Sequence, residues 1–331
     1  MRRIIVATLL TLALITGAPP LATAQERPLC FETAAHATPD QRIASCTALI
    51  TAGDLTPADT AIAYCNRGVS YEDKGQTALA LADYDTAVAL APDANSIALC
   101  RVYAKITRGA FDDAIVDLDR IIARDQTAVR AYVTRGRAHR GKGDLDLAIA
   151  DYSAAIRLDP TDPVALYDRA TAQLKRHEYD SAIGDASVAI RLAPRNAMAF
   201  ITRGSAYLHK KRYDLALADF NTAIEIDATS VLAVYRRSTL HLQRHDYDRA
   251  IADASEAIRL DPTFAAAFIT RGTAYFQKRL YEPAIADCDA AIRLAPANSS
   301  AFHCRGAAYL AKGEKARGNA DLERAKQLAP R

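Results

Sequence analysis

Residues 197–230 read AMAFITRGSAYLHKKRYDLALADFNTAIEIDATS, and this 34-residue unit decides the fold. Its stretch AFITRGSAY, at residues 199–207, returns as AFITRGTAY at residues 267–275. Prolines that follow alanine or aspartate mark the same phase along the chain, separated by 34 residues or by twice that: Pro92, Pro160, Pro194, Pro262, Pro296 and Pro330. A fixed period of this length indicates a solenoid of stacked helical hairpins.

The same landmarks recur at fixed positions within each unit. Position 4 is usually large, position 8 small and position 11 often tyrosine, while positions 20 and 27 are mostly alanine. Small residues let the two helices of a unit approach closely, and proline at position 32 stops the second helix. Eight units follow one another without an insertion, at residues 61–94, 95–128, 129–162, 163–196, 197–230, 231–264, 265–298 and 299–331.

This pattern resembles the tetratricopeptide repeat, whose signature has a large aromatic residue, glycine, tyrosine, alanine and proline at these offsets. The resemblance covers residues 61–331 and implies an all-α protein, an α-solenoid that winds into a right-handed superhelix. Unit two departs most from the pattern. It has Ala98, Val102 and Lys105 at positions 4, 8 and 11, and Gln126 in place of proline.

Two charged positions do not vary among the eight units. Position 7 is always arginine, from Arg67 to Arg305, and position 23 is always aspartate, from Asp83 to Asp321. The planar guanidinium of arginine meets a carboxylate with two hydrogen bonds. The pattern therefore predicts a ladder of ion pairs between first and second helices, within or between units.

A second charge pattern allows two interpretations. Position 14 is basic in every unit, and position 18 is acidic in units two to seven. Both placements complement the helix dipoles, because position 14 ends a first helix and position 18 begins a second helix. The alternative is a basic edge that binds an anionic polymer, strengthened locally by Lys210, Lys211 and Arg212.

The N-terminus has the pattern of a secretory signal peptide over residues 1–24. Two arginines precede an apolar stretch at residues 4–18, and Ala-Thr-Ala at 22–24 supplies the small residues that a signal peptidase recognises. We expect cleavage before Gln25. The mature chain would then be periplasmic or secreted, without a transmembrane segment.

The two ends of the mature chain differ from the repeats between them. Residues 25–60 form no complete unit, and we expect a helix from Asp40 to Gly53 that serves as an N-terminal cap. The last helix, from Glu314, is unusually polar, as a terminal repeat requires. Removal of residues 1–24 leaves 40 of the 42 basic residues against 39 acidic ones. This balance excludes a general nucleic-acid binder, which would be strongly basic.

Six cysteines remain after cleavage, and an even number in an exported chain indicates disulfides. The last two flank Pro296 at equal distances, and the middle two lie at positions 5 and 6 of adjacent first helices. We expect the sequential pairs Cys30–Cys46, Cys65–Cys100 and Cys288–Cys304. The alternative is that some are free buried thiols.

The resemblance also implies a binding surface, because first helices line the concave groove of this family, chiefly at positions 2, 5, 9, 12 and 13. These positions carry an apolar to aromatic floor with hydroxyls along it: Leu99, Val133, Tyr167, Ile201, Tyr235 and Ile269 at position 5; Tyr103, Arg137, Thr171, Ser205, Thr239 and Thr273 at position 9; Leu174, Leu208, Leu242 and Phe276 at position 12. Such a floor suits an extended peptide or an amphipathic helix. The alternative is burial by curvature or self-association. A carboxylate clamp is not expected, because Asn66 alone matches its pattern.

The sequence has no pattern that indicates catalysis. It contains no glycine-rich phosphate loop, and no nucleophile stands outside the repeat pattern. His241 and His245 have the i, i+4 spacing of metal ligands, but His139 and His177 occupy the same repeat positions singly. We therefore expect no enzyme, no cofactor and no metal.

Together these features predict a non-catalytic scaffold or adaptor of the cell envelope that binds a protein or peptide in its groove. Similar exported repeat proteins serve as scaffolds for envelope enzymes and secretion machines. The alternative function is a scaffold for export or assembly of an anionic envelope polymer, peptidoglycan or exopolysaccharide. The sequence does not name the partner and leaves self-association open.

Overall fold

The computed structural model describes residues 26–31 and 37–329, in which there are eighteen helices and no strand. The expected signal peptide, residues 1–24, lies outside these residues. The chain divides into two compact parts, residues 1–158 and 159–331, which we call the N-terminal part and the C-terminal part. Each is an α-solenoid of consecutive helical hairpins, and each is described by itself.

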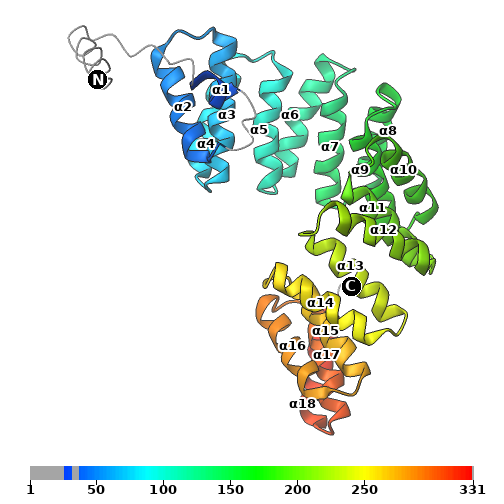
Figure 1. Cartoon of the computed structure of the whole chain (residues 1–331). Coiled ribbons are helices and arrows are strands. Elements are labelled where there is room, and N and C mark those ends of the chain that lie inside the picture. The colour runs from blue at the N-terminus through cyan, green and yellow to red at the C-terminus, as the bar shows by residue number, and fades with distance from the viewer. Residues whose placement is uncertain (1–25, 32–36, 330–331) are drawn as a thin grey trace, which may run out of the picture. The chain divides into compact units, whose positions relative to one another are not determined.

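Eight helices form the N-terminal part, and successive helices pack on one another (Figure 1). They are α1 (Glu26–Phe31), α2 (Pro39–Ala52), α3 (Pro57–Asp73), α4 (Thr77–Leu90), α5 (Asn95–Thr107), α6 (Phe111–Arg124), α7 (Val129–Lys142) and α8 (Leu145–Leu158).

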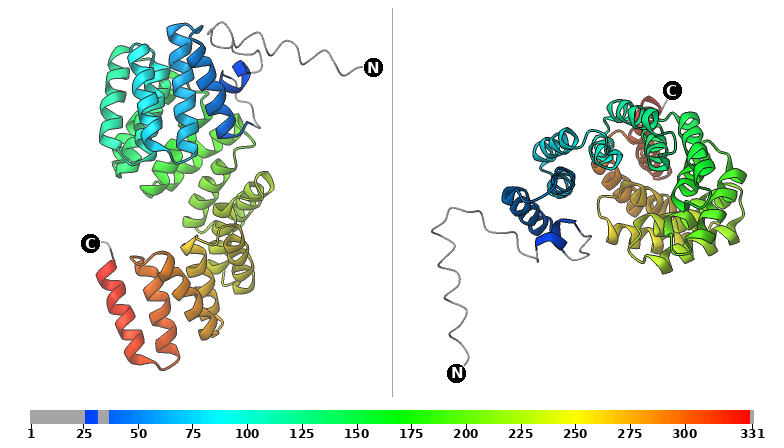
Figure 2. Two further views of the ribbon diagram at one scale, coloured as in Figure 1. Left: turned by 90° about the vertical axis from the view of Figure 1, so that its left-hand side faces the viewer. Right: turned by 90° about the horizontal axis from the view of Figure 1, so that it is seen from above.

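Ten helices form the C-terminal part, again as hairpins that lie side by side (Figure 2). They are α9 (Pro163–Lys175), α10 (Tyr179–Leu192), α11 (Ala197–His209), α12 (Tyr213–Ile226), α13 (Val231–Gln243), α14 (Tyr247–Leu260), α15 (Ala265–Gln277), α16 (Tyr281–Leu294), α17 (Ser299–Ala311) and α18 (Lys315–Leu328). Every second helix of the eight units spans positions 17–30. No described helix is both long enough and apolar enough to cross a membrane.

The N-terminal end differs from the sequence expectation in two respects. The short helix α1 was not expected, and α3 begins at Pro57, four residues before the first unit. A cap explains the early start of α3, because the Thr56 hydroxyl accepts a hydrogen bond from the Asp59 N–H and Pro57 fits the first helical turn. The expected helix from Asp40 to Gly53 corresponds to α2.

Every first helix is followed, at position 15 of its unit, by a residue in the left-handed conformation. In unit five, the Lys211 N–H donates to the Leu208 carbonyl at 2.9 Å and the Arg212 N–H donates to the Tyr207 carbonyl at 2.8 Å. This pair of bonds satisfies the last carbonyls of α11 and reverses the chain into α12. Glycine occupies position 15 in units one, two, three and eight, whereas the other four units have larger residues: His177, Lys211, His245 and Arg279.

The predicted ladder of ion pairs is confirmed within all eight units. In unit five, Arg203 donates through Nε and Nη2 to the two carboxylate oxygens of Asp219, at 2.9 and 2.7 Å. This hydrogen bonding raises the pKa of Arg203. The eight pairs are Arg67–Asp83, Arg101–Asp117, Arg135–Asp151, Arg169–Asp185, Arg203–Asp219, Arg237–Asp253, Arg271–Asp287 and Arg305–Asp321.

The same arginines also join neighbouring units. The Nη1 of Arg203 donates to the Ser187 hydroxyl at position 25 of the preceding unit, 3.2 Å away. At the N-terminal end, Arg67 reaches Thr47 of α2 in the same way, at 3.1 Å. The helix α2 therefore occupies the place that the second helix of a preceding unit would take.

Close approach of the helices within a unit depends on position 8. A Cβ added to Gly204 would lie 2.8 Å from the Phe220 ring at position 24, and Gly68 and Gly136 face Tyr84 and Tyr152 similarly. Units four and six instead combine a larger position 8 with a small position 24: Ala170 with Ala186, and Ser238 with Ala254. In these five units the volumes at positions 8 and 24 compensate each other, as a close-packed interior requires. Unit two departs from this, because Val102 and Leu118 are both large and buried.

The structure joins the six cysteines in the three sequential pairs, with no free cysteine among the described residues. Cys30 of α1 is bonded to Cys46, which lies in the middle of α2. Cys65–Cys100 joins α3 to α5, and Cys288–Cys304 joins α16 to α17. The second and third disulfides therefore link neighbouring hairpins, and the first links α1 to α2.

Candidate functional site

The sixteen side chains expected in a groove lie at different depths. Only Tyr103 is largely exposed, at 41%. Ten others are half-buried and can contribute to a surface, among them Tyr167, Tyr235 and Phe276. The remaining five are buried and have little surface to offer a ligand: Leu99, Val133, Ile201, Ser205 and Leu208.

The hydroxyls expected along the groove are already bonded to their own helices. Thr171 and Thr239 donate to the carbonyls of Tyr167 and Tyr235, each at 3.0 Å, and Thr273 donates to the Ile269 carbonyl at 2.8 Å. Ser205 bonds to the Ile201 carbonyl in the same way. The half-buried hydroxyls therefore have accepting lone pairs to offer a ligand rather than a proton.

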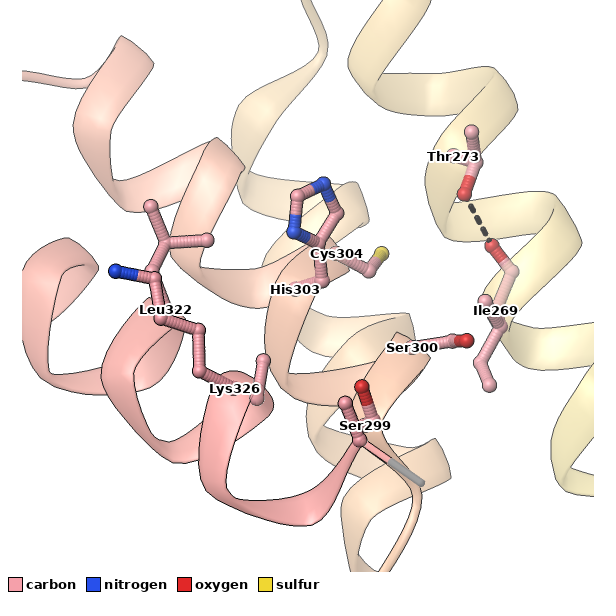
Figure 3. Close-up of a pocket in the computed structure, with 10 residues that line it drawn as sticks. Ile269, Thr273, Ser299, Ser300, His303, Cys304, Leu322 and Lys326 are labelled. Atoms are coloured by element: carbon pink, nitrogen blue, oxygen red, sulfur yellow. Dashed lines mark hydrogen bonds between the residues drawn. The ribbon is translucent and has the colours of Figure 1, made fainter. Parts of the chain in front are cut away.

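A hollow of about 520 Å³ brings two of the expected residues together with others that the sequence analysis missed. Figure 3 shows Ile269 and Thr273 of α15 on one side, His303 of α17 between, and Leu322 and Lys326 of α18 opposite. We call this site the C-terminal hollow. Its volume falls within the range of roughly 300–1,000 Å³ that is typical of ligand sites.

The chemistry of the C-terminal hollow suits an amphipathic ligand. Ile269 and Leu322 supply apolar surface, Ser299 and Ser300 supply hydroxyls at the start of α17, and Lys326 supplies a positive charge. His303 lies at position 5 of unit eight, the position of Ile269 in unit seven. The position-5 residues expected in the groove stop at Ile269 of unit seven, and extending them to unit eight would have identified His303.

Family comparisons agree with this architecture. Profiles described as tetratricopeptide repeat match residues 61–94, 167–231 and 235–299, and a TPR repeat profile matches residues 136–176. These matches together cover more than half of the chain. This chain belongs to the tetratricopeptide repeat family.

Solved structures share the tetratricopeptide repeat fold at low sequence identity. A tetratricopeptide repeat protein from Parabacteroides merdae ATCC 43184 is 22% identical, with a TM-score of 0.59 over 70% of this chain and 92% of that chain. The APC/C hetero-tetramer Cut9–Hcn1 is 15% identical, with a TM-score of 0.67 over 88% of this chain and 57% of that chain. A comparison with curated proteins finds no match.

The one residue that matched the carboxylate-clamp pattern of tetratricopeptide repeats has a structural contact. The side-chain amide of Asn66 donates to the Cys30 carbonyl at 2.8 Å. This bond holds α1 against α3. The Asn66 amide therefore helps to position α1 rather than standing ready for a peptide carboxylate.

Acidic partners accompany the basic residues at position 14 of these tetratricopeptide repeats. Lys142 binds Asp112 at 2.5 Å and Arg244 binds Asp214 at 2.9 Å, in each case at position 18 of the preceding unit. The same pairing occurs in Lys210–Asp180, Lys278–Asp248 and Lys312–Glu282. The acids offset much of the basic charge, which weakens the interpretation of this edge as a site for an anionic polymer.

The two histidines with metal-ligand spacing have different surroundings. His241 is buried, with Nδ1 3.9 Å from Asp246 and Nε2 3.8 Å from Asp253, whereas the ring of His245 is hydrogen-bonded to the Tyr247 hydroxyl. The described residues contain no cluster of three or more histidine, cysteine or acidic side chains arranged to bind a metal. Burial lowers the pKa of His241.

Proposed function

We propose that this protein is a non-catalytic adaptor of the cell envelope that binds a helical or extended segment of a partner protein. Tetratricopeptide repeat proteins are in general interaction scaffolds, and export is supported by the N-terminal sequence and by three disulfides. The observation that carries the binding proposal is the C-terminal hollow, formed by first-helix positions 5 and 9 together with α18.

The shape of the C-terminal hollow favours a helix as its occupant. The α18 residues that line it are at positions 24, 27 and 28 of unit eight, and Ala329 follows at position 31. One unit earlier, α17 of unit eight packs on α16 of unit seven, where position 24 is Cys288, which forms the disulfide to Cys304. A partner helix with an apolar face would meet α18 as α17 meets α16, which is the helix-in-groove mode of recognition.

Photo-crosslinking from within the hollow tests the binding proposal. A benzoylphenylalanine replaces exposed His303 in the full chain, and a matched control carries it at Leu215 of α12, which is 47% exposed and outside the hollow. We expect one partner to be crosslinked from position 303 and not from 215. Thr273→Lys should abolish that crosslink by filling the hollow.

Three outcomes of the crosslinking are informative. An adduct of twice the chain mass would identify a second copy of this protein as the occupant of the hollow. The same products from both positions, or none from position 303 in intact cells, would contradict binding at the hollow.

Export is tested separately by fractionation and N-terminal sequencing of the native protein. We expect a mature chain that begins at Gln25 and is recovered from the periplasm or the medium. Recovery from the cytoplasm with residues 1–24 attached would contradict the envelope location, whatever the crosslinking shows.

A further inference from the structure

Unit two lacks a ring that most other units have at position 4. In five units this residue is aromatic, and the position-7 arginine lies over it, with 5.1–5.7 Å between the guanidinium carbon and the ring centre. Units four and six have Leu166 and Val234 there, both buried. Unit two has only Ala98, so Arg101 has no ring beneath it from its own unit.

The missing ring coincides with a cavity of about 450 Å³ in the N-terminal part, which we call the unit-two hole. Its apolar lining comes from Val88 and Pro92 of the preceding unit and from Ala98 and Ile121 of unit two. The neighbouring side chains therefore have not collapsed into the space. A phenyl or phenol ring is the group that this position holds in five other units.

The polar lining of the unit-two hole is also incomplete. In the other units, Nε of the arginine donates to the position-23 aspartate; here Lys105 bonds to Oδ2 of Asp117 at 2.6 Å, and Arg101 contacts Oδ1 through Nη2 at 3.1 Å. The Nε of Arg101 is consequently buried without a hydrogen-bond partner in the described structure. A buried donor without a partner is costly, so the ion pair of unit two is less complete than that of the other units.

The charge of the unit-two hole defines the second half of its ligand. Three guanidinium groups line it, from Arg101, Arg120 and Arg124. Arg124 is paired with Asp93 at 3.3 Å and Arg101 also with Asp85 at 3.4 Å, so the positive surplus lies at Arg120, which shares Asp117 with Arg101 and Lys105. The side chain of Arg120 is 71% exposed and lies 3.5 Å from Asp117. An incoming carboxylate beside the ring would meet this positive surplus, and arginine binds carboxylates with two parallel hydrogen bonds.

We propose that the unit-two hole binds a phenylalanine or tyrosine side chain of a partner protein that has a carboxylate directly beside it, as a C-terminal aromatic residue has. The ring takes the place of the missing position-4 side chain beneath Arg101, and the carboxylate contacts Arg120. This second site goes beyond the proposed function, because it lies in the other part of the chain from the C-terminal hollow and shares no residue with it.

A titration with a small mimic tests the site without a known partner. N-acetylphenylalanine supplies ring and carboxylate, N-acetylphenylalaninamide supplies the ring alone, and N-acetylleucine supplies neither ring nor matching shape. We expect methyl resonances of Val88, Ala98 and Ile121 in the full chain to shift with N-acetylphenylalanine, with a Kd on the order of 1 mM for a ligand of this size. The amide should bind up to about fivefold more weakly, and the leucine derivative should not bind.

Two variants separate the ring from the charge. Ala98→Phe should fill the hole with the chain's own ring and weaken binding at least about tenfold, since the site is then occupied. Leu166→Phe makes a similar change at the same position of unit four and should leave binding unaltered. Arg120→Gln, at the surface, should weaken the acid to the affinity of the amide and leave the amide unchanged.

The opposite results would overturn the proposal. One is that the resonances of Val88, Ala98 and Ile121 do not shift when the concentration of N-acetylphenylalanine reaches 20 times its expected Kd. The other is that N-acetylphenylalanine still binds to Ala98→Phe. If N-acetylphenylalanine bound the native chain and Arg120→Gln with equal affinity, the proposed contact between the carboxylate and Arg120 would be wrong. None of these outcomes depends on crosslinking at the C-terminal hollow.

Discussion

Residues at position 15 carry a conformational cost that differs among the units. Lys211 has φ of 58°, a left-handed conformation that costs about 1 kcal/mol for a residue with a Cβ. Lys211→Gly should relieve that cost, partly offset by the greater freedom of glycine in the unfolded chain, for a net gain of about 0.5 kcal/mol. Urea denaturation of the full chain measures the change.

The reverse substitution provides the control. Gly313 has φ of 89° at the same position of unit eight, and no atom lies within 4 Å of the Cβ that a substitution would add. By the same balance of left-handed cost and unfolded-chain freedom, Gly313→Lys should therefore destabilise the protein by about 0.5 kcal/mol. A gain from Gly313→Lys, or a loss from Lys211→Gly, would show that φ does not control these turns.

His241 makes the stability of the C-terminal part depend on pH. Burial lowers its pKa most, Arg237 and Arg249 lower it further, and Asp253 and Asp246 act in the opposite direction. Because the folded pKa lies below the unfolded value of about 6.5, the unfolded chain binds more protons as the pH falls below 6.5. Stability should fall there by at most about 1.4 kcal/mol per pH unit from this group.

The test of His241 compares the native chain with His241→Tyr, which installs the residue found at position 11 in units five and seven, Tyr207 and Tyr275. Urea midpoints at pH 7.5, 6.0 and 5.0 should fall less steeply for the variant. Parallel pH profiles of the two proteins would mean that His241 does not titrate differently in the folded and unfolded states.

At the scale of the helix pair, positions 8 and 24 form a coupled packing unit. Gly204→Ala should cost about 1–3 kcal/mol, because the added methyl group would lie 2.8 Å from the buried ring of Phe220. Phe220→Ala should cost about 3–5 kcal/mol through the cavity that it leaves. The double variant recreates the Ala170–Ala186 pair of unit four, so its cost should be less than the sum of the two.

A double-mutant cycle by urea denaturation measures this coupling. Gly184→Ala is the matched control, since Gly184 lies in α10 with no atom within 4 Å of an added Cβ. That single change should not destabilise the protein, and it should be additive with Phe220→Ala. Additive costs for Gly204→Ala and Phe220→Ala would contradict the packing interpretation.

The helices could be predicted because each boundary depends on local residues that repeat. The invariant arginine and aspartate at positions 7 and 23 also sufficed for the ion-pair ladder. By contrast, α1 has only six residues and no periodicity to reveal it, although Thr56 and Pro57 were visible as a start signal for α3. Repeat phase indicates the direction of a side chain but not its depth, which is why Leu99 and Ile201 proved to be buried.

At the scale of the whole molecule, the two cavities differ in how far the sequence predicted them. His303 follows from the repeat phase, whereas the contribution of α18 to the C-terminal hollow required the packing of three helices. Ala98 and Lys105 were recognised as departures from the family pattern. Whether the neighbours would collapse into the space left by a missing ring depends on side-chain packing, which no local pattern specifies.

Contacts in a stacked repeat protein reach only neighbouring units, so the three disulfides should stabilise the chain locally. Two of them join α1 to α2 and α3 to α5, and the third joins α16 to α17. Loops of 16 and 35 residues give each bond about 3–4 kcal/mol in the chain-entropy account. Hydrogen exchange with and without a reductant should therefore show faster exchange in α1–α5 and α16–α17, while α11–α13 keep their protection. Equal loss of protection through α11–α13 would mean instead that the chain opens as one cooperative unit, and that the disulfides act on all repeats together.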